Sequence, residues 1–442
     1  MANIGFISLG CAKNQVDCER MMYRVQEAGH NVCAGIVDCD VVVINTCGFI
    51  DSAKSEAIDH ILQTAALKQE GMVGKILVTG CLSQRYQQEI LNEMPEVDGI
   101  LGTGSYHKIV EAIDALLDEQ SVSDFASIDE PELETGRILT TPEHYAYLKI
   151  AEGCDNRCSY CIIPYLRGKF RSRPMDDVLY EARLLAASGV KEIIVVAQDT
   201  SRYGTDLGDG KRLLPELLRE LCAIEDFTWV RLHYLYPDEI DSELIDVIAS
   251  EPKIVKYLDI PIQHCNSKIL DLMNRRGNGE YLRWLFGELR SRIPGLVLRT
   301  SVITGLPGEG EEEFAELCTF LKDMKLERVG AFPFSPEEGT PAADMDYPDN
   351  EIAQRRAQMV ETIQSRIMDA YNEAMIGKEL QVLVDGYDEE FEQYFGRTYA
   401  DSPEIDGRVW IASQDDISEG DFVTVCIDGL IDGDLSGYIV EE

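Results

Sequence analysis

Residues 145–161 read Tyr-Ala-Tyr-Leu-Lys-Ile-Ala-Glu-Gly-Cys-Asp-Asn-Arg-Cys-Ser-Tyr-Cys, so three closely spaced cysteines follow an apolar run. The run Tyr147–Ile150 predicts a buried strand, and Cys154, Cys158 and Cys161 then lie on the loop that follows it. Three thiolates on one short loop can bind three irons of a [4Fe–4S] cluster and leave the fourth iron open. We therefore expect these three cysteines to carry a cluster.

The open iron decides what such a site can do. A structural zinc ion would instead be closed by a fourth nearby cysteine or histidine, and the candidate Cys222 lies far along the chain on a predicted helix. S-adenosylmethionine can chelate an open iron through its amino and carboxylate groups, and one electron then cleaves it to a 5′-deoxyadenosyl radical. Such a radical takes hydrogen from a strong C–H bond that no side-chain base can deprotonate. The loop therefore predicts radical chemistry on an unactivated carbon.

A basic segment surrounds this loop. Residues 156–175 contain no acidic residue, although the whole chain has a formal net charge of -40. We expect these basic side chains to hold a carboxylate of a ligand or substrate, with at least two of them pairing instead with acids across a domain interface. The basic residues are Arg157, Arg167, Lys169, Arg171 and Arg173.

A second trio of cysteines shares a position rather than a spacing. Cys11, Cys47 and Cys81 each come just after an apolar run, and each has a glycine beside it. The carboxyl ends of parallel strands meet at one edge of a sheet, so thiols 36 and 34 residues apart can come together there. Glycine also lets the backbone approach a bulky group closely. We expect a second, auxiliary [4Fe–4S] cluster with an open iron that can carry sulfur, the alternative being three core cysteines.

The remaining seven of the thirteen cysteines are interpreted as structural, because free cysteine is commonly buried. They lie within or beside predicted helices and strands and not after strands in a shared pattern. They are Cys18, Cys33, Cys39, Cys222, Cys265, Cys318 and Cys426.

The hydrophobic pattern divides the chain into an α/β protein of three parts. Residues 1–118 alternate short apolar runs with helices, which is typical of a parallel sheet, and the polar stretch 119–142 predicts a linker. Residues 143–375 contain six strand–helix units, too few for a closed eight-stranded barrel, so we expect an open partial (β/α)6 barrel with its chemistry at the carboxyl ends of the strands. Residues 376–442 predict a small antiparallel β-barrel. The six central strands are expected at Tyr147–Ile150, Glu192–Val196, Trp229–Leu232, Val255–Ile260, Val297–Ile303 and Val329–Phe332.

Over essentially its whole length the chain resembles the methylthiotransferase family of radical S-adenosylmethionine enzymes. The motifs that carry the resemblance are Leu9-Gly10-Cys11-Ala12-Lys13-Asn14 with Asp17 and Glu19, Asn45-Thr46-Cys47, Thr79-Gly80-Cys81, and the Gly153–Cys161 loop running into Ile163-Pro164. One departure is Cys18, which stands where the family usually has a serine. The resemblance implies an N-terminal cluster domain, a radical domain and a C-terminal TRAM barrel. It also implies that S-adenosylmethionine is used both as methyl donor and as radical source.

Within the family, further segments are similar to the branch that modifies an aspartate β-carbon in protein S-twelve of the small ribosomal subunit. They are residues 164–174 (Pro-Tyr-Leu-Arg-Gly-Lys-Phe-Arg-Ser-Arg-Pro), Ala197-Gln198-Asp199-Thr200 with Tyr203, Gly204 and Asp206, and residues 396–401 (Gly-Arg-Thr-Tyr-Ala-Asp). The sister branch modifies an adenosine in transfer RNA. That branch is the main alternative, and a non-catalytic iron–sulfur carrier is a more remote one.

Charge separates the two branches independently of the motifs. The segment 376–442 has 18 acidic and 3 basic residues, a net charge of -15, whereas a barrel that binds RNA should carry Lys and Arg against the phosphates. We therefore do not expect direct RNA binding by the TRAM barrel, and we expect docking to a basic ribosomal protein. An electron donor is a further expected partner. No apolar run is long enough to span a bilayer, and residues 1–10 lack the basic start of a secretory signal, so we expect a cytoplasmic protein.

Contacts to S-adenosylmethionine are expected at the mouth of the partial barrel. Tyr160, directly before the third cysteine, can pack on the adenine, and Gln198 and Asp199 at the end of the second strand can reach the ribose or the amino group. Ile303 begins a glycine-bearing turn, residues 303–309, after the fifth strand. Gln263 and His264 end the fourth strand, and His233 follows the third; each can equally be a barrel-mouth hydrogen-bonding residue.

Overall fold

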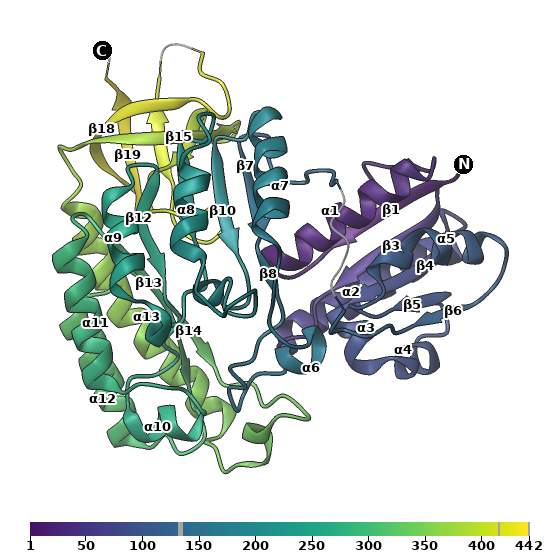
Figure 1. Cartoon of the computed structure of the whole chain (residues 1–442), viewed down its shortest axis with the longest axis horizontal. Helices are drawn as coiled ribbons and strands as arrows, with labels where there is room; N and C mark the ends of the chain where they lie inside the picture. Colours follow the sequence, from purple (N-terminus) through teal and green to yellow (C-terminus); the bar gives the residue numbers. More distant parts are fainter. Residues whose placement is uncertain (131–135, 414–415, 441–442) are drawn as a thin grey trace.

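In the computed structural model, which describes residues 1–130, 136–413 and 416–440, the chain forms three packed units (Figure 1). The first is a six-stranded sheet in the order β2-β1-β3-β4-β5-β6, with every pairing parallel. Its strands are β1 (Asn3–Ser8), β2 (Asn31–Val32), β3 (Cys39–Thr46), β4 (Val73–Gly80), β5 (Gly99–Leu101) and β6 (Val122–Asp124). Its helices are α1 (Ala12–Glu27), α2 (Asp51–Gln69), α3 (Cys81–Tyr86), α4 (Gln88–Glu93) and α5 (Ile109–Leu117).

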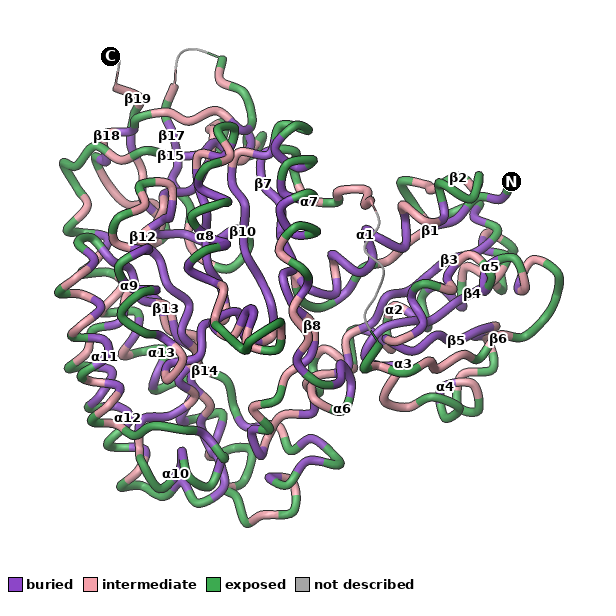
Figure 2. Tube along the Cα trace, viewed as in Figure 1, coloured by how far each residue is buried: buried purple, intermediate pink, exposed green. Residues whose placement is uncertain are grey.

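The two faces of this sheet explain its near-continuous apolar strands. Val41 and Val43 pack into one cluster with residues of α1 and α5, while Val42 and Ile44 pack into another with residues of α2 and α4. Successive side chains of a strand point to opposite faces, so a strand covered by helices on both faces must be apolar at every position. Figure 2 shows these strands buried along most of their length.

The central unit is an open parallel sheet in the order β14-β13-β12-β11-β10-β7, which confirms the predicted partial barrel. Its strands are β7 (Tyr145–Lys149), β10 (Glu192–Val196), β11 (Trp229–Leu232), β12 (Ile254–Asp259), β13 (Val297–Thr304) and β14 (Arg328–Pro333). A short antiparallel pair, β8 (Ala151–Glu152) with β9 (Arg171–Ser172), follows β7. The helices are α6 (Ile163–Arg167), α7 (Met175–Ala187), α8 (Leu214–Cys222), α9 (Ser242–Ser250), α10 (Ser267–Leu272), α11 (Gly279–Arg292), α12 (Glu311–Met324) and α13 (Asn350–Glu373).

The N-terminal unit covers part of the inner face of this open sheet. Ala146 and Leu148 of β7 pack against the outer helices, whereas Tyr145 and Tyr147 alternate to the other face and contact Val16 of α1. Figure 1 accordingly shows α1 lying beside β7. The first helix of one unit therefore packs on the sheet of the next.

The third unit is a closed five-stranded barrel in the order β15-β16-β17-β19-β18, as the sequence predicts. It docks on the amino ends of the central strands, because Glu192, the first residue of β10, pairs with Arg397 of the barrel at 2.7 Å and with Arg231 of β11 at 2.6 Å. The cysteine loops lie at the opposite, carboxyl ends. The barrel strands are β15 (Glu379–Asp388), β16 (Gln393–Arg397), β17 (Val409–Ala412), β18 (Phe422–Ile431) and β19 (Asp434–Ile439).

Six strands do not appear in the sequence prediction, namely β2, β5, β6, β8, β9 and β16. β6 lies within the stretch 119–142 expected to be a linker and pairs with β5 at the sheet edge; part of that stretch, residues 131–135, lies outside the described residues. All of them except β16 have only two or three residues, and a strand that short is held by its neighbour more than by its own apolar periodicity. Within the described residues, no helix has the length and apolarity needed to cross a membrane.

One buried carboxylate ties the N-terminal and central units together. Glu181 of α7 lies 2.6 Å from Arg173, 3.3 Å from Arg20 of α1 and 3.3 Å from Arg137. Burial opposes its ionisation, but the guanidinium groups, Arg137 first, outweigh burial and lower the pKa of Glu181 to about 2. An ionised carboxylate at the interface is therefore part of the folded state.

The first prediction concerns acid stability. Because the pKa of Glu181 is lower in the folded chain than in the unfolded one, its contribution of about 3 kcal/mol should be complete above about pH 4.5 and vanish as pH falls toward 2. In Glu181→Gln the deficit in unfolding free energy should therefore be largest at neutral pH and shrink below pH 4.5. Urea unfolding of the metal-free chain at several pH values measures it. The exposed Glu216→Gln is the control, and an equal deficit at pH 7 and pH 3 would contradict the assignment.

Candidate active site

The central cysteine loop is folded tightly against the strand pair that follows it. Gly153 has a φ of 77°, and a Cβ there would lie 2.1 Å from the Lys169 carbonyl oxygen, so only glycine fits. The Cys154 N–H donates to the Gly168 carbonyl at 3.1 Å, and the Cys161 N–H donates to the Cys158 carbonyl at 3.0 Å. These backbone bonds hold the three cysteines on one short turn.

The thiols of this trio lie within electrostatic reach of one another. Burial raises the pKa of Cys154 to about 11, and Cys158 adds to the shift. Burial also raises the pKa of Cys161, with smaller contributions from Cys158 and Cys154. The neutral thiols of Cys154 and Cys161 are therefore favoured without a metal, and binding iron would release their protons.

The second trio comes together as the strand-end argument predicts. Cys11 directly precedes α1, Cys47 follows β3, and Cys81 begins α3 directly after β4. Burial raises the pKa of Cys47 to about 12, and the neighbouring Cys81 and Cys11 contribute further. The three residues thus share one edge of the sheet.

Glycines make this convergence possible. Gly10 has a φ of 92°, and a Cβ there would lie 2.7 Å from the Cβ of Cys47. Gly80 has a φ of 98°, and a Cβ there would lie 2.3 Å from the Thr46 carbonyl oxygen. Larger residues would push the cysteine loops apart.

Both trios have the donor set of an open cluster. Among the described residues, no three cysteine, histidine, aspartate or glutamate side chains gather closely enough to share one metal ion. Each thiolate of a cubane binds a different iron, so a cluster takes thiols that are more widely spaced than around a zinc ion, which holds its sulfur ligands at about 2.3 Å. Three thiolates on glycine-lined loops therefore fit a [4Fe–4S] cluster in each place.

The two trios face each other across the interface between the N-terminal and central units. Cys81 packs with Ile162 and Leu166, which follow Cys161 directly in the chain, and with Phe49 beside Cys47. The Thr103 hydroxyl also donates to the Leu166 carbonyl at 2.6 Å. Helix α6 of one cysteine loop therefore lies against α3 of the other, as Figure 1 shows.

Between the trios lies a buried group of charges that sequence reasoning did not assemble. Arg167 and Lys149 of the central unit both pair with Asp17 of α1, and both also contact Glu152, at 3.3 and 3.0 Å. Burial opposes ionisation of Glu152, but Lys149 and Arg167 hold its pKa well below its usual range. Asp17 belongs to a family motif quoted above, and Arg167 belongs to the basic segment. The sequence therefore identified both residues but did not predict that they pair with each other.

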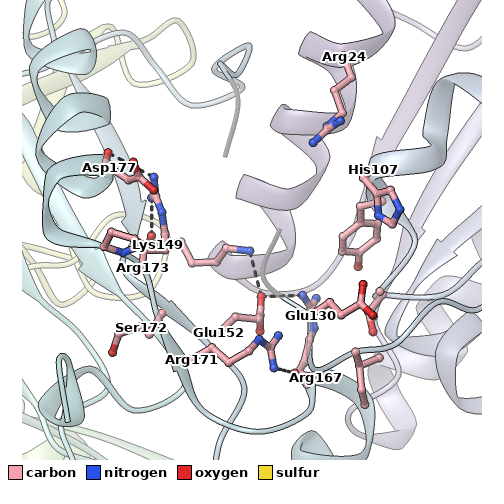
Figure 3. Close-up of a pocket in the computed structure, with 16 residues that line it drawn as sticks. Arg24, His107, Glu130, Lys149, Glu152, Arg167, Arg171, Ser172, Arg173 and Asp177 are labelled. Carbon is pink, nitrogen blue, oxygen red and sulfur yellow. Dashed lines mark hydrogen bonds and ion pairs between the residues drawn. The ribbon is translucent and has the colours of Figure 1, made fainter. Parts of the chain in front are cut away.

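These charges border a cavity of about 450 Å³ between the two units. Figure 3 shows Lys149, Glu152 and Arg167 joined by ion pairs on one side of it, with Arg24 and His107 of the N-terminal unit opposite. Ile128 and Glu130 of the stretch 119–142 also line it.

The basic segment around the loop is largely engaged within the protein. Arg167 pairs across the unit interface with Asp17, and Arg173 pairs with Glu181 within the central unit. Arg171 lies 3.8 Å from Asp129.

The residues expected to contact S-adenosylmethionine lie in two groups at the carboxyl ends of the strands. Tyr160 and Ile303 join one apolar cluster with Leu306 and Phe334. The Tyr160 hydroxyl accepts a hydrogen bond of 3.1 Å from Arg275, a residue absent from the sequence prediction.

Gln198 and Asp199 form the other group, after β10. Gln198 donates to Glu152 at 2.5 Å, and its buried carbonyl oxygen has no hydrogen-bond partner among the described residues. Asp199 accepts hydrogen bonds from Asn156 at 2.7 Å and Ser201 at 2.5 Å, and burial raises its pKa. An unpaired amide oxygen beside the cysteine loop is suited to a ligand's amino or hydroxyl group.

The ambiguous histidines have structural partners. His233 lies 3.0 Å from the Ser402 hydroxyl of the third unit, and His264 lies 3.3 Å from Glu309 of the glycine-bearing turn. Gln263 has a φ of 67° and forms a parallel bridge with Val302.

Comparison with known proteins decides the family. The Radical SAM superfamily matches residues 148–321, the TRAM domain matches residues 376–440, and the uncharacterized protein family UPF0004 matches residues 3–102. The ribosomal protein uS12 methylthiotransferase RimO of Lachnoclostridium phytofermentans is 47% identical over 436 residues, covering 98% of this chain and 99% of the relative. That of Clostridioides difficile is 44% identical over the full length of both chains.

The chain belongs to the RimO family. It is a radical S-adenosylmethionine methylthiotransferase, and members of this class use S-adenosylmethionine and an iron–sulfur cluster. The fold is also similar to a solved structure of the radical S-adenosylmethionine methyltransferase TsrM of Kitasatospora setae, with cobalamin and a [4Fe–4S] cluster bound. That similarity has a TM-score of 0.58 and 13% identity over 77% of this chain and 76% of the other. The fold of this chain is therefore similar to that of a distantly related radical enzyme over about three quarters of its length.

A second ion-pair group, also missed from the sequence, holds the Cys47 loop. Glu337, which follows β14, lies 2.5 Å from Arg85 of α3 and 3.1 Å from Lys54 of α2, and its side chain is only 1% exposed. Arg85 also donates to the carbonyl of Gly48, next to Cys47, at 3.1 Å. Glu337 thus joins the central unit to the segments that follow Cys47 and Cys81, two of the three cysteine-bearing loops of the RimO N-terminal unit.

The second prediction tests this contact. Glu337→Gln removes the shared counter-charge of the partly buried Arg85 and Lys54, of which Lys54 keeps Asp51 as a second partner. Breaking a fully buried pair typically costs about 3–5 kcal/mol. We expect the unfolding free energy, measured by urea titration at pH 7, to fall by up to that amount. The exposed neighbour Glu338→Gln is the matched control, and equal stability of the two variants would refute the role of Glu337.

Proposed function

We propose that this chain adds a methylthio group to the β-carbon of an aspartate in ribosomal protein uS12, with two [4Fe–4S] clusters held by the two cysteine trios. The observation that carries the proposal is the docking of the Cys81 loop against α6, which directly follows Cys161. Radical formation at one site and sulfur delivery at the other need adjacent sites, and the interface makes them neighbours. The relatives named for this activity match the chain along its whole length.

The radical-side residues have separate tasks. When bound, the cluster at Cys154, Cys158 and Cys161 with S-adenosylmethionine supplies a radical able to take hydrogen from an unactivated carbon. Tyr160 and Ile303 offer an apolar surface for the adenine, and the free carbonyl oxygen of Gln198 offers an acceptor.

Cys11, Cys47 and Cys81 are proposed as ligands of the auxiliary cluster. Its open iron would present the sulfur that is transferred to the substrate carbon. The glycine-dependent convergence of the three loops, and the packing of Cys81 on the segment after Cys161, support this assignment.

The charge of the third unit supports a basic protein substrate. Of its three basic residues, Arg397 is buried against Glu192 and Asp385, and Arg408 stacks on Phe395 and Trp410. Arg397 is therefore withdrawn from the outer surface, while Arg408 stays exposed. With 18 acidic residues against three basic ones, that surface attracts basic protein and repels phosphate. We accordingly propose docking to uS12 in the cytoplasm and expect an electron donor as a second partner.

The third prediction separates the two cluster sites. Cys161→Ala should lose one cluster and all 5′-deoxyadenosine formation, because the radical cluster then lacks a ligand. Cys47→Ala should keep S-adenosylmethionine cleavage but form no methylthio product. Iron content, 5′-deoxyadenosine and product mass are measured after anaerobic reconstitution. Cys222→Ala, on the outer helix α8, is the control that should keep both clusters; methylthio product from either of the other variants would remove that cysteine from the site.

The fourth prediction identifies the substrate. In cells lacking this gene, we expect uS12 to lose the mass of one methylthio group relative to wild type. The transfer RNA of the same cells should be unchanged. Mass spectrometry of both pools gives the result. A missing increment on transfer RNA with unchanged uS12 would assign the chain to the sister activity.

A further inference from the structure

Arg167 occupies a position that neither cluster site explains by itself. It is the last residue of α6, six residues after Cys161, and only 4% of its surface is exposed. Its Nε donates to the thiol of Cys81 at 3.4 Å, although Cys81 belongs to the other unit. A guanidinium carried by the radical loop therefore touches a proposed ligand of the auxiliary cluster.

The remaining donors of Arg167 fix this geometry. Nη1 pairs with Asp17 at 2.5 Å and with Glu152 at 3.3 Å, and Nη2 donates to the Asn14 side-chain oxygen at 2.9 Å. Figure 3 shows the side chain reaching from α6 into this group beside Glu152 and Lys149. Since every nitrogen is used and the group is buried, Arg167 has one orientation, with Nε aimed at sulfur.

Such a contact has a known physical consequence for a cluster ligand. Hydrogen bonds to the sulfurs and nearby net charge set the reduction potential of an iron–sulfur cluster. Both effects stabilise the more negative, reduced state. Arginine also keeps its charge at any physiological pH, so the contribution is permanent.

Arg275, the arginine near Cys158 of the other trio, does not connect the two units in the described part of the chain. Arg275 lies 3.8 Å from the thiol of Cys158, and its closer partners, Tyr160 and the Pro261 carbonyl, all belong to the central unit. Arg167, by contrast, reaches from α6, the helix that follows the radical loop, and donates a hydrogen bond to Cys81 of the other trio.

We propose that Arg167 is a positioning residue that raises the reduction potential of the auxiliary cluster through its N–H···S contact with Cys81, and so makes that potential depend on docking of the radical loop. This inference rests on the proposed function, because it requires a cluster at Cys11, Cys47 and Cys81. Asp17, Glu152 and Asn14 act by holding the guanidinium in place.

The experiment compares three full-length variants after anaerobic reconstitution. Arg167→Gln removes the charge and the Nε donor, Arg167→Lys keeps the charge but not the fork of donors, and Arg171→Gln removes the same charge four residues away without a cysteine contact. Iron and sulfide are counted first, and the midpoint potentials of both clusters are then measured by redox titration with electron paramagnetic resonance. The signals are assigned with Cys47→Ala and Cys161→Ala.

We expect the auxiliary midpoint to move to a more negative value in Arg167→Gln, to move less in Arg167→Lys, and to stay unchanged in Arg171→Gln. The radical-cluster midpoint should move least. A fully loaded Arg167→Gln enzyme with an unshifted auxiliary midpoint would overturn the inference and leave the proposed function intact. If the glutamine variant does not retain iron, the lysine variant decides by the same criterion. About four irons in the wild-type chain, by contrast, would refute the two-cluster function itself.

Discussion

The arrangement of the active site depends on a buried guanidinium, that of Arg167, which finds its counter-charges on two different units. A buried charge is tolerated only when it is paired and hydrogen-bonded. Glu152 lies in the same unit, but Asp17 and Asn14 come from the first helix of the N-terminal unit. The charge is therefore fully compensated only when the units are docked, and docking brings the two cysteine trios face to face.

The cysteine loops and the C-terminal barrel lie at opposite ends of the central sheet. The cysteine loops and their ligand-binding candidates lie at the carboxyl ends of the strands, where loops can vary without disturbing the sheet. The third unit covers the amino ends, where Glu192 binds Arg231 and Arg397. Because Arg397 is consumed in this internal contact, the barrel remains acidic toward its surroundings, which is the property that suits a basic ribosomal protein.

The sequence predicts the main strands well because their signal is local. Val41–Ile44 is apolar at every position since both faces of β3 are covered, and the six strands of the central sheet all lie where their apolar runs place them. The strands that it misses are β2, β5, β6, β8, β9 and β16. β6, for example, is a Val-Ser-Asp segment in an acidic stretch and becomes a strand only by pairing with β5. Pairing at an edge depends on a neighbour that local periodicity does not report.

The sequence by itself was enough to propose the six cysteines of the two trios, because loop spacing and strand-end position are visible in one dimension. It also determined the radical class, since three thiolates leave one iron open. Only the tertiary structure decided which of the basic side chains could bind a ligand. Arg167 and Arg173 belong to the basic segment expected to bind anions, but they form ion pairs with Asp17 and Glu181 within the protein. Such pairs join residues far apart in the chain, and their energy exists only when burial removes water from both partners.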